Sequence, residues 1–82
     1  MAAEICAAVD DLVPRVGWMG EEVMHALMCV NHHAYAVFEG GGREEVAALR
    51  SAMRDLEGVV EEGSDVHDRV VSMSRLADAV GR

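Results

Sequence analysis

Hydrophobic and polar positions along this chain alternate with a helical period in four successive segments. The longest uncharged segment lies within residues 21–39, where no Asp, Glu, Lys or Arg occurs from Val23 to Phe38. A helix that is apolar over most of its circumference is normally buried, either enclosed by neighbouring helices or shared across an oligomer interface. We therefore expect residues 21–39 to form the central helix, with Gly20 as its N-cap and a run of glycines after Glu39 ending it.

The preceding segment predicts a short amphipathic helix over residues 2–13. Its apolar positions recur at the spacing i, i+4, i+7, and they are Ile5, Val9 and either Leu12 or Val13. Pro14 has no amide hydrogen to donate, and its ring clashes with the preceding helical turn. We therefore expect the helix to end before Pro14 and residues 14–17 to form a turn.

Two further segments each carry an apolar seam at alternating three- and four-residue steps, as in packed helix pairs. In residues 43–62 the seam is Val46, Leu49, Met53, Leu56 and Val60. In residues 65–80 it is Val66, Val70, Met73, Ala77 and Val80. Ser64 is a suitable N-cap between the two helices, Gly58 is expected to fray the first, and Gly81 is expected to end the second. A short turn between them predicts an antiparallel helical hairpin.

Together the segments predict an all-α fold in one domain, residues 1–82. The expected architecture is a small helical bundle of four segments: a short first helix, the central apolar helix, and the antiparallel hairpin. Hydrophobic residues make up 51% of the chain, but it has one Trp, one Tyr and one Phe, a composition that favours a helical bundle over a β-sandwich. A chain of 82 residues buries only about 60% of its unfolded surface, so we expect it to gain stability by forming a homo-oligomer.

The charge of the chain narrows the classes of partner. A net charge of −8 argues against direct binding of nucleic acid and against an anionic membrane surface. The uncharged stretch is too short and too polar to span a membrane, and the acidic N-terminus does not resemble a signal peptide. We therefore expect a cytoplasmic protein whose two cysteines, Cys6 and Cys29, are reduced thiols that pack as small hydrophobic residues.

One stripe of the expected central helix contains the side chains with the most distinctive chemistry. Glu22, His25, Cys29, His32 and His33 fall within a sector about 100° wide. A thiolate with imidazoles and a carboxylate suits zinc, copper or iron, and His25 or His33 has the chemistry of an axial haem ligand. The further ligands would come from Glu62, Asp65, His67 and Asp68, or from the same stripe of a second copy. The simpler interpretation is that this stripe faces solvent.

Two short motifs resemble those of small helical-hairpin proteins exported by type VII secretion. They are Trp18-Met19-Gly20, similar to the Trp-x-Gly turn of that family, and Tyr35 followed four residues later by Glu39, similar to its Tyr-x-x-x-Asp/Glu signal. The resemblance implies two long helices joined at the Trp-x-Gly turn. The absence of Lys, Thr and Gln beside abundant Arg, Ala and Gly indicates a GC-rich coding sequence, as in actinobacteria and their phages.

The sequence supports no catalytic residues. Cys29 with His25 or His33 forms a thiol–imidazole pair, but one straight helix does not provide the orienting group and oxyanion donors of a nucleophilic site. The pattern therefore favours a non-enzymatic, acidic interaction module, such as an oligomerising adaptor or an antitoxin-like or inhibitor-like regulator. We expect it to contact itself or another protein, with no cofactor, while a metal- or haem-binding bundle is the alternative. The predicted contact surface is Trp18, Leu27, Tyr35, Phe38, Val46, Leu49, Met53 and Leu56.

Overall fold

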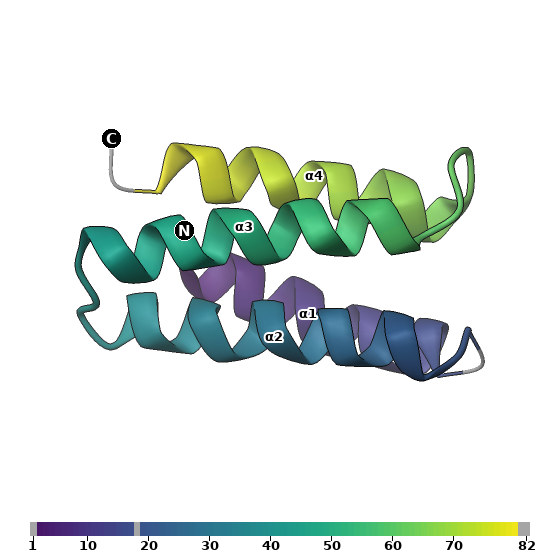
Figure 1. Cartoon of the computed structure of the whole chain (residues 1–82), viewed down its shortest axis with the longest axis horizontal. Helices are drawn as coiled ribbons and strands as arrows, with labels where there is room; N and C mark the ends of the chain where they lie inside the picture. The colour runs from purple at the N-terminus through teal and green to yellow at the C-terminus, as the bar shows by residue number, and fades with distance from the viewer. Residues whose placement is uncertain (1, 18, 81–82) are drawn as a thin grey trace.

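The computed structural model describes residues 2–17 and 19–80, and in this part of the chain it contains four α-helices and no strand. The helices are α1 (Ala2–Val16), α2 (Glu21–Phe38), α3 (Arg43–Val59) and α4 (Asp65–Ala79). Consecutive helices run in opposite directions along the long axis of the molecule (Figure 1). The predicted all-α bundle of four segments is therefore confirmed.

The four helices are arranged as the corners of a square. Each packs against two others, in the pairs α1–α2, α2–α3, α3–α4 and α1–α4. The last two helices form the expected antiparallel hairpin, and α1 closes the square against α4 (Figure 1). Because α2 packs against α1 and α3, its inner side is enclosed by the bundle, while its outer side points away from it.

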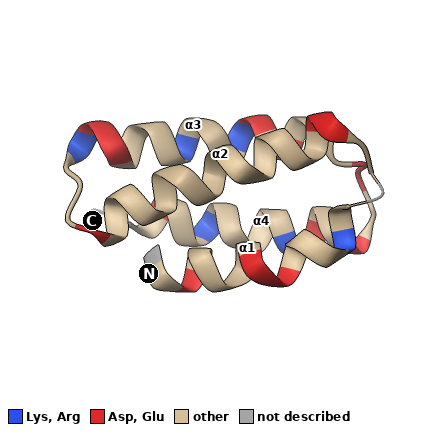
Figure 2. Ribbon diagram, turned by 90° about the horizontal axis from the view of Figure 1, so that it is seen from below, with Lys and Arg blue, Asp and Glu red and all other residues tan. Residues whose placement is uncertain are grey.

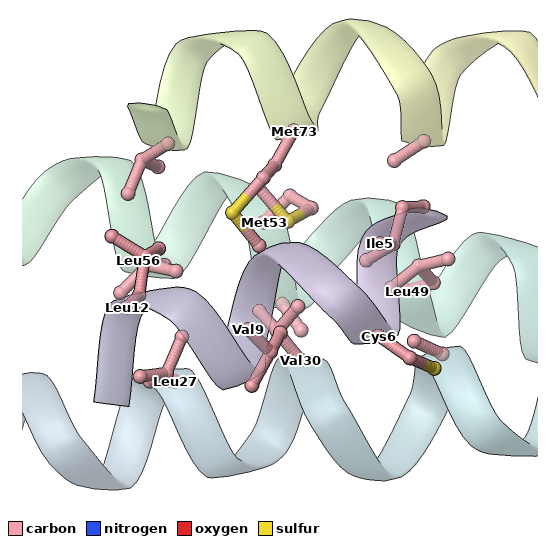
Figure 3. Packing of buried hydrophobic residues seen from close by; sticks show 14 of the residues in the cluster. Ile5, Cys6, Val9, Leu12, Leu27, Val30, Leu49, Met53, Leu56 and Met73 are labelled. Atoms are coloured by element: carbon pink, nitrogen blue, oxygen red, sulfur yellow. The ribbon is translucent and has the colours of Figure 1, made fainter. Parts of the chain in front are cut away.

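The core lies along the axis of this square and follows the predicted seams. Among the residues that the structure describes, nineteen form one buried apolar cluster to which all four helices contribute, and none of those buried is polar or charged. Figure 3 shows Leu12, Leu27 and Leu56 meeting from three helices, and the Met53 and Met73 side chains approaching each other from α3 and α4. Each such large apolar side chain contributes about 1.5–3 kcal/mol to stability when it is fully buried.

The end of α1 corrects the prediction from Pro14. The helix continues through Pro14 to Val16, whose side chain is buried on the same face as Leu12. A proline inside a helix costs about 3 kcal/mol because its ring crowds the carbonyl one turn earlier and it donates no hydrogen bond. That carbonyl belongs to Asp10, a residue on the exposed side of α1, and only one short turn follows the proline. Burial of the Val16 side chain stabilises the last residues of α1 and so offsets part of the cost of the proline.

Three other helix ends, both ends of α2 and the start of α4, follow the predicted signals closely. Gly20 is the N-cap of α2, and the Gly40 and Gly41 amides donate to the Val37 and Ala36 carbonyls at 3.1 and 2.9 Å, which closes the last turn. The Ser64 hydroxyl accepts a hydrogen bond from the His67 amide at 3.1 Å and so caps α4.

The third helix ends at Val59, directly after Gly58, where the sequence analysis expected it to weaken, and does not continue to about residue 62. Val60 takes an extended conformation that keeps its side chain buried. Gly63, with φ of 81°, then reverses the chain toward α4. The expected stop at Gly81 lies outside the described residues.

Candidate interaction face on α2

The outward side of α2 carries an uncharged surface, which we call the outer face and define as His25, Met28, Cys29, His32 and Tyr35. Met28 and Tyr35 are 39% and 46% exposed, and Cys29 is half-buried beside them. The ribbon of α2 is free of charged residues along its middle in Figure 2. The other helices differ, because each presents exposed charged residues along its length: Glu4, Asp10 and Asp11 on α1, Glu44, Arg54 and Asp55 on α3, and Asp68, Arg75 and Asp78 on α4.

A shallow groove adjoins the outer face where α1 meets the end of α2. Its volume is about 280 Å³, and its lining is Ala3, Cys6, Ala7, Asp10, Tyr35 and Phe38. Phe38 is 60% exposed, the most exposed large apolar side chain in the described residues. The groove therefore extends the apolar surface from α2 onto α1.

The two cysteines are free thiols with different surroundings. Cys6 is buried in the core, and burial first, with the negative charge of Asp10 second, raises the pKa of its thiol. Such a thiol is a poor nucleophile, so Cys6 acts as a packing residue, in agreement with the prediction. Cys29 is half-buried on α2, where it packs against the core.

The His/Cys stripe lies on α2 as the sequence predicts, but only part of it is brought together. The Cys29 sulfur lies 4.0 Å from Nδ1 of His25, and the rings of His32 and His33 meet edge to face with centroids 5.2 Å apart. Within the described residues no group of three or more His, Cys, Asp or Glu side chains could hold a metal ion. Glu22 therefore does not complete a three-ligand site with His25 and Cys29 inside one chain.

The additional ligands considered from the sequence do not join the stripe either. α4 lies diagonally opposite α2 and begins with Asp65, His67 and Asp68, and Glu62 lies in the turn before it.

Two polar atoms of α2, Oδ1 of Asn31 and Nδ1 of His33, are shielded from solvent without a hydrogen-bond partner among the described residues. His33 is thus half-buried, whereas His25 and His32 are exposed.

The predicted contact surface separates into core and surface residues. Leu27, Leu49, Met53 and Leu56 are fully buried within one chain, so they stabilise the fold and are not available to a partner. Tyr35 and Phe38 are exposed, Val46 is half-buried, and Trp18 lies outside the described residues. The same heptad pattern marks helix contacts inside a bundle and between chains, which is why the sequence alone assigned these positions to a surface.

Met28 is an exposed apolar residue that the sequence analysis did not include in its predicted contact surface. It flanks the apolar side of α2, and only the position of α1 and α3 shows that it faces outward. One feature of the sequence could have pointed to Met28, because no charged residue lies near it along the chain. An exposed methionine surrounded by uncharged residues suits a contact surface better than a surface that stays in contact with water.

Arg15 and Arg69 form a network of ion pairs that joins α1 to α4. Arg69 bonds Asp11 at 2.7 Å and Asp65 at 3.0 Å, which ties α4 to α1, and Arg15 lies 3.6 Å from both carboxylates. Asp65 is the main cause of the raised pKa of Arg69. All four side chains are substantially exposed, so this network adds little to stability.

A hollow of about 500 Å³ lies where α3 begins, at the other end of the bundle from this ion-pair network. It is lined by Gly41, Gly42, Arg43, Val46, Ala47, Arg50 and Val80. Its most buried cation, Arg50, already donates to three carbonyl groups at the end of α4, those of Ala77, Asp78 and Val80. We therefore interpret Arg50 as a structural residue.

Comparisons with known proteins do not indicate a function for this chain. No protein-family model matches the chain, and neither a curated protein nor a solved structure is significantly similar to it. The type VII resemblance implies two long helices joined at Trp18-Met19-Gly20, whereas the described residues form a four-helix bundle in which Tyr35 lies inside α2 and Glu39 caps it. Within the described residues, no helix is long and apolar enough to cross a membrane.

Proposed function

We propose that this protein is a non-enzymatic interaction module that associates with a second copy of itself through the outer face of α2. The observation that carries this proposal is the exposure of Met28 and Tyr35 on a helix side that has no charged residue from Val23 to Phe38. Exposed apolar side chains that lie together, bordered by polar residues, are typical of protein contact sites.

A second copy is the occupant that fits the charge of the molecule. In a two-fold symmetric dimer the same surface packs against itself, so a charged surface would meet like charge. With a net charge of −8, most of the surface of this chain repels its own copy. The outer face avoids this repulsion because its polar groups are imidazoles, a thiol and a phenol, which are all self-compatible when uncharged.

The size of the face indicates a weak association. A helix of 18 residues is about 27 Å long and about 10 Å across, which gives a footprint on the order of 300 Å². Stable dimers bury about 800 Å² on each partner, and smaller contacts are typically transient. We therefore expect a dissociation constant in the micromolar range or above, unless the adjoining groove on α1 widens the contact.

Sedimentation equilibrium over a wide range of protein concentration tests this proposal. We expect a monomer–dimer equilibrium for the native chain and a dimerisation weakened at least about tenfold by Met28→Glu, because a charge would be buried in the contact. Ser51→Glu is the matched control, since it adds the same charge to the exposed side of α3. A native chain that stays monomeric at all concentrations, or equal effects of the two substitutions, would contradict the proposal.

A further inference from the structure

The side chains of His25 and Cys29 are separated by a distance close to that of two ligands on one metal ion. Their Nδ1 and Sγ atoms are 4.0 Å apart, one helical turn from each other on the outer face. Zinc bonds an imidazole nitrogen at about 2.0 Å and a thiolate at about 2.3 Å, so tetrahedral geometry places the two donor atoms about 3.5 Å apart. A small rotation about the side-chain bonds of either residue brings the pair to this spacing.

One chain supplies half of the required shell. Structural zinc sites have four protein ligands, and the described residues of one chain form no group of three or more His, Cys, Asp or Glu side chains that could hold the ion. A two-fold axis passing next to the His25–Cys29 pair, on the outer side of α2, would bring the same pair from a second copy to the opposite side of the ion. Two imidazoles and two thiolates then complete a tetrahedral set that suits zinc.

We infer that His25 and Cys29 from two copies of this chain bind one zinc ion and so clamp the dimer formed through the outer face. The inference rests on the proposed function, because it uses the same self-association. Zinc binding would also add affinity that the outer face alone does not provide, since a footprint on the order of 300 Å² is small for a stable dimer. When zinc binds, the two Cys29 thiols lose their protons to solvent and the ligated sulfurs are thiolates.

The surroundings of the pair suit a site that forms on association. His25 is exposed and Cys29 is half-buried and free, so an ion can reach both from solvent. The nearest carboxylate on the same stripe, Glu22, lies one turn before His25 and is exposed at the border of the expected contact. Met28 lies between the two ligands along the helix, so apolar contact with the partner shields the ion from water.

Two methods test the inference on the full chain: native mass spectrometry and sedimentation equilibrium, each with added zinc chloride. A phosphine reductant keeps the thiols free in both. We expect one zinc ion per two chains, and dimerisation tightened about 100-fold when free zinc is about 100 times its dissociation constant. Replacing zinc with cobalt(II) should produce thiolate charge-transfer absorption, which reports the sulfur ligand directly. His25→Ala and Cys29→Ser should each abolish the tightening and the absorption, whereas His67→Ala, which removes an imidazole from α4, should preserve both.

The possible results separate this inference from the proposed function. Metal-free dimers that do not respond to zinc would overturn the zinc clamp and keep the self-association. One zinc per monomer, or cobalt absorption that persists in Cys29→Ser, would also overturn the clamp, because the pair would not be the shared ligand set. Dimers that form with zinc in the expected stoichiometry but never without it would support the clamp and overturn metal-free self-association.

Discussion

At the residue scale, we expect opposite effects on stability from an alanine at two glycines, one just after a helix and one inside a helix. Gly40 follows the C-cap of α2 with φ of 102°, in the left-handed region where a Cβ atom clashes with the backbone, although a Cβ there would meet no other residue within 4 Å. Gly58 lies inside α3 with ordinary helical geometry, and a Cβ there would also meet nothing. The pair therefore isolates the effect of backbone conformation from that of packing.

We expect Gly40→Ala to lower the free energy of unfolding by about 1–2 kcal/mol, because alanine is strained at this φ. Gly58→Ala should raise it by about 0.5–1 kcal/mol, because alanine loses less backbone freedom in a helix. Urea unfolding followed by circular dichroism measures both. If Gly40→Ala proved neutral, α2 would not end in the left-handed conformation at this position.

The sequence predicted which side chains share one side of α2 better than it predicted what that side faces. The imidazoles and the thiol of the stripe do lie on one side of α2, because helical periodicity places residues three and four apart together. Whether that side faces the core, a neighbouring helix or solvent depends on where α1 and α3 pack. His33 turns toward the bundle while His25 turns outward, and no local pattern distinguishes them.

At the element scale, the end of α4 depends on a residue of another helix. Nε of Arg50 on α3 donates to the Ala77 carbonyl at 3.3 Å, and its Nη2 donates to the carbonyls of Asp78 and Val80 at 3.1 and 2.9 Å. The last carbonyls of a helix have no partner within it, and a cation near them also interacts favourably with the helix dipole. Arg50 thus acts as a C-terminal cap supplied across the α3–α4 contact.

We expect Arg50→Ala to lower the free energy of unfolding by about 1–2 kcal/mol, since hydrogen bonds from a charged donor contribute more than neutral ones but this side chain is partly exposed. Arg54→Ala is the matched control, because Arg54 is exposed on the same helix and should change stability by less than about 0.5 kcal/mol. Amide hydrogen exchange should show the loss concentrated in the last turn of α4. Equal effects of the two substitutions would remove the capping role.

Elements were predicted well wherever a local signal specifies their ends. Gly20, Ser64 and the glycines after Glu39 mark three ends correctly, because caps act within one turn. Pro14 misled the prediction because a local rule competes with the burial of Val16, which only the assembled bundle provides. The assignment of Leu49 and Met53 to the core, rather than to a contact between chains, likewise needed the partner helices to be placed.

At the scale of the whole molecule, the bundle combines an acidic surface with one uncharged side. The exposed charges of α1, α3 and α4 give two copies a mutual repulsion, and in the proposed dimer the outer face would add apolar attraction without charge. The balance between these forces depends on ionic strength, because salt screens the first and has little effect on the second. The balance therefore distinguishes a dimer held by apolar contact from one held by ion pairs.

We expect dimerisation to become several-fold tighter as sodium chloride is raised from about 0.01 M to about 1 M, since the screening length falls from about 30 Å to about 3 Å. Sedimentation equilibrium in a zinc-free buffer measures the change, and Arg75→Glu, which adds negative charge to exposed α4, should steepen the salt dependence while leaving the high-salt affinity similar. A dimer that dissociates with salt would instead require contacts between acidic residues and arginines. Such contacts cannot come from the middle of α2, which has neither, so that result would move the interface to another side of the bundle.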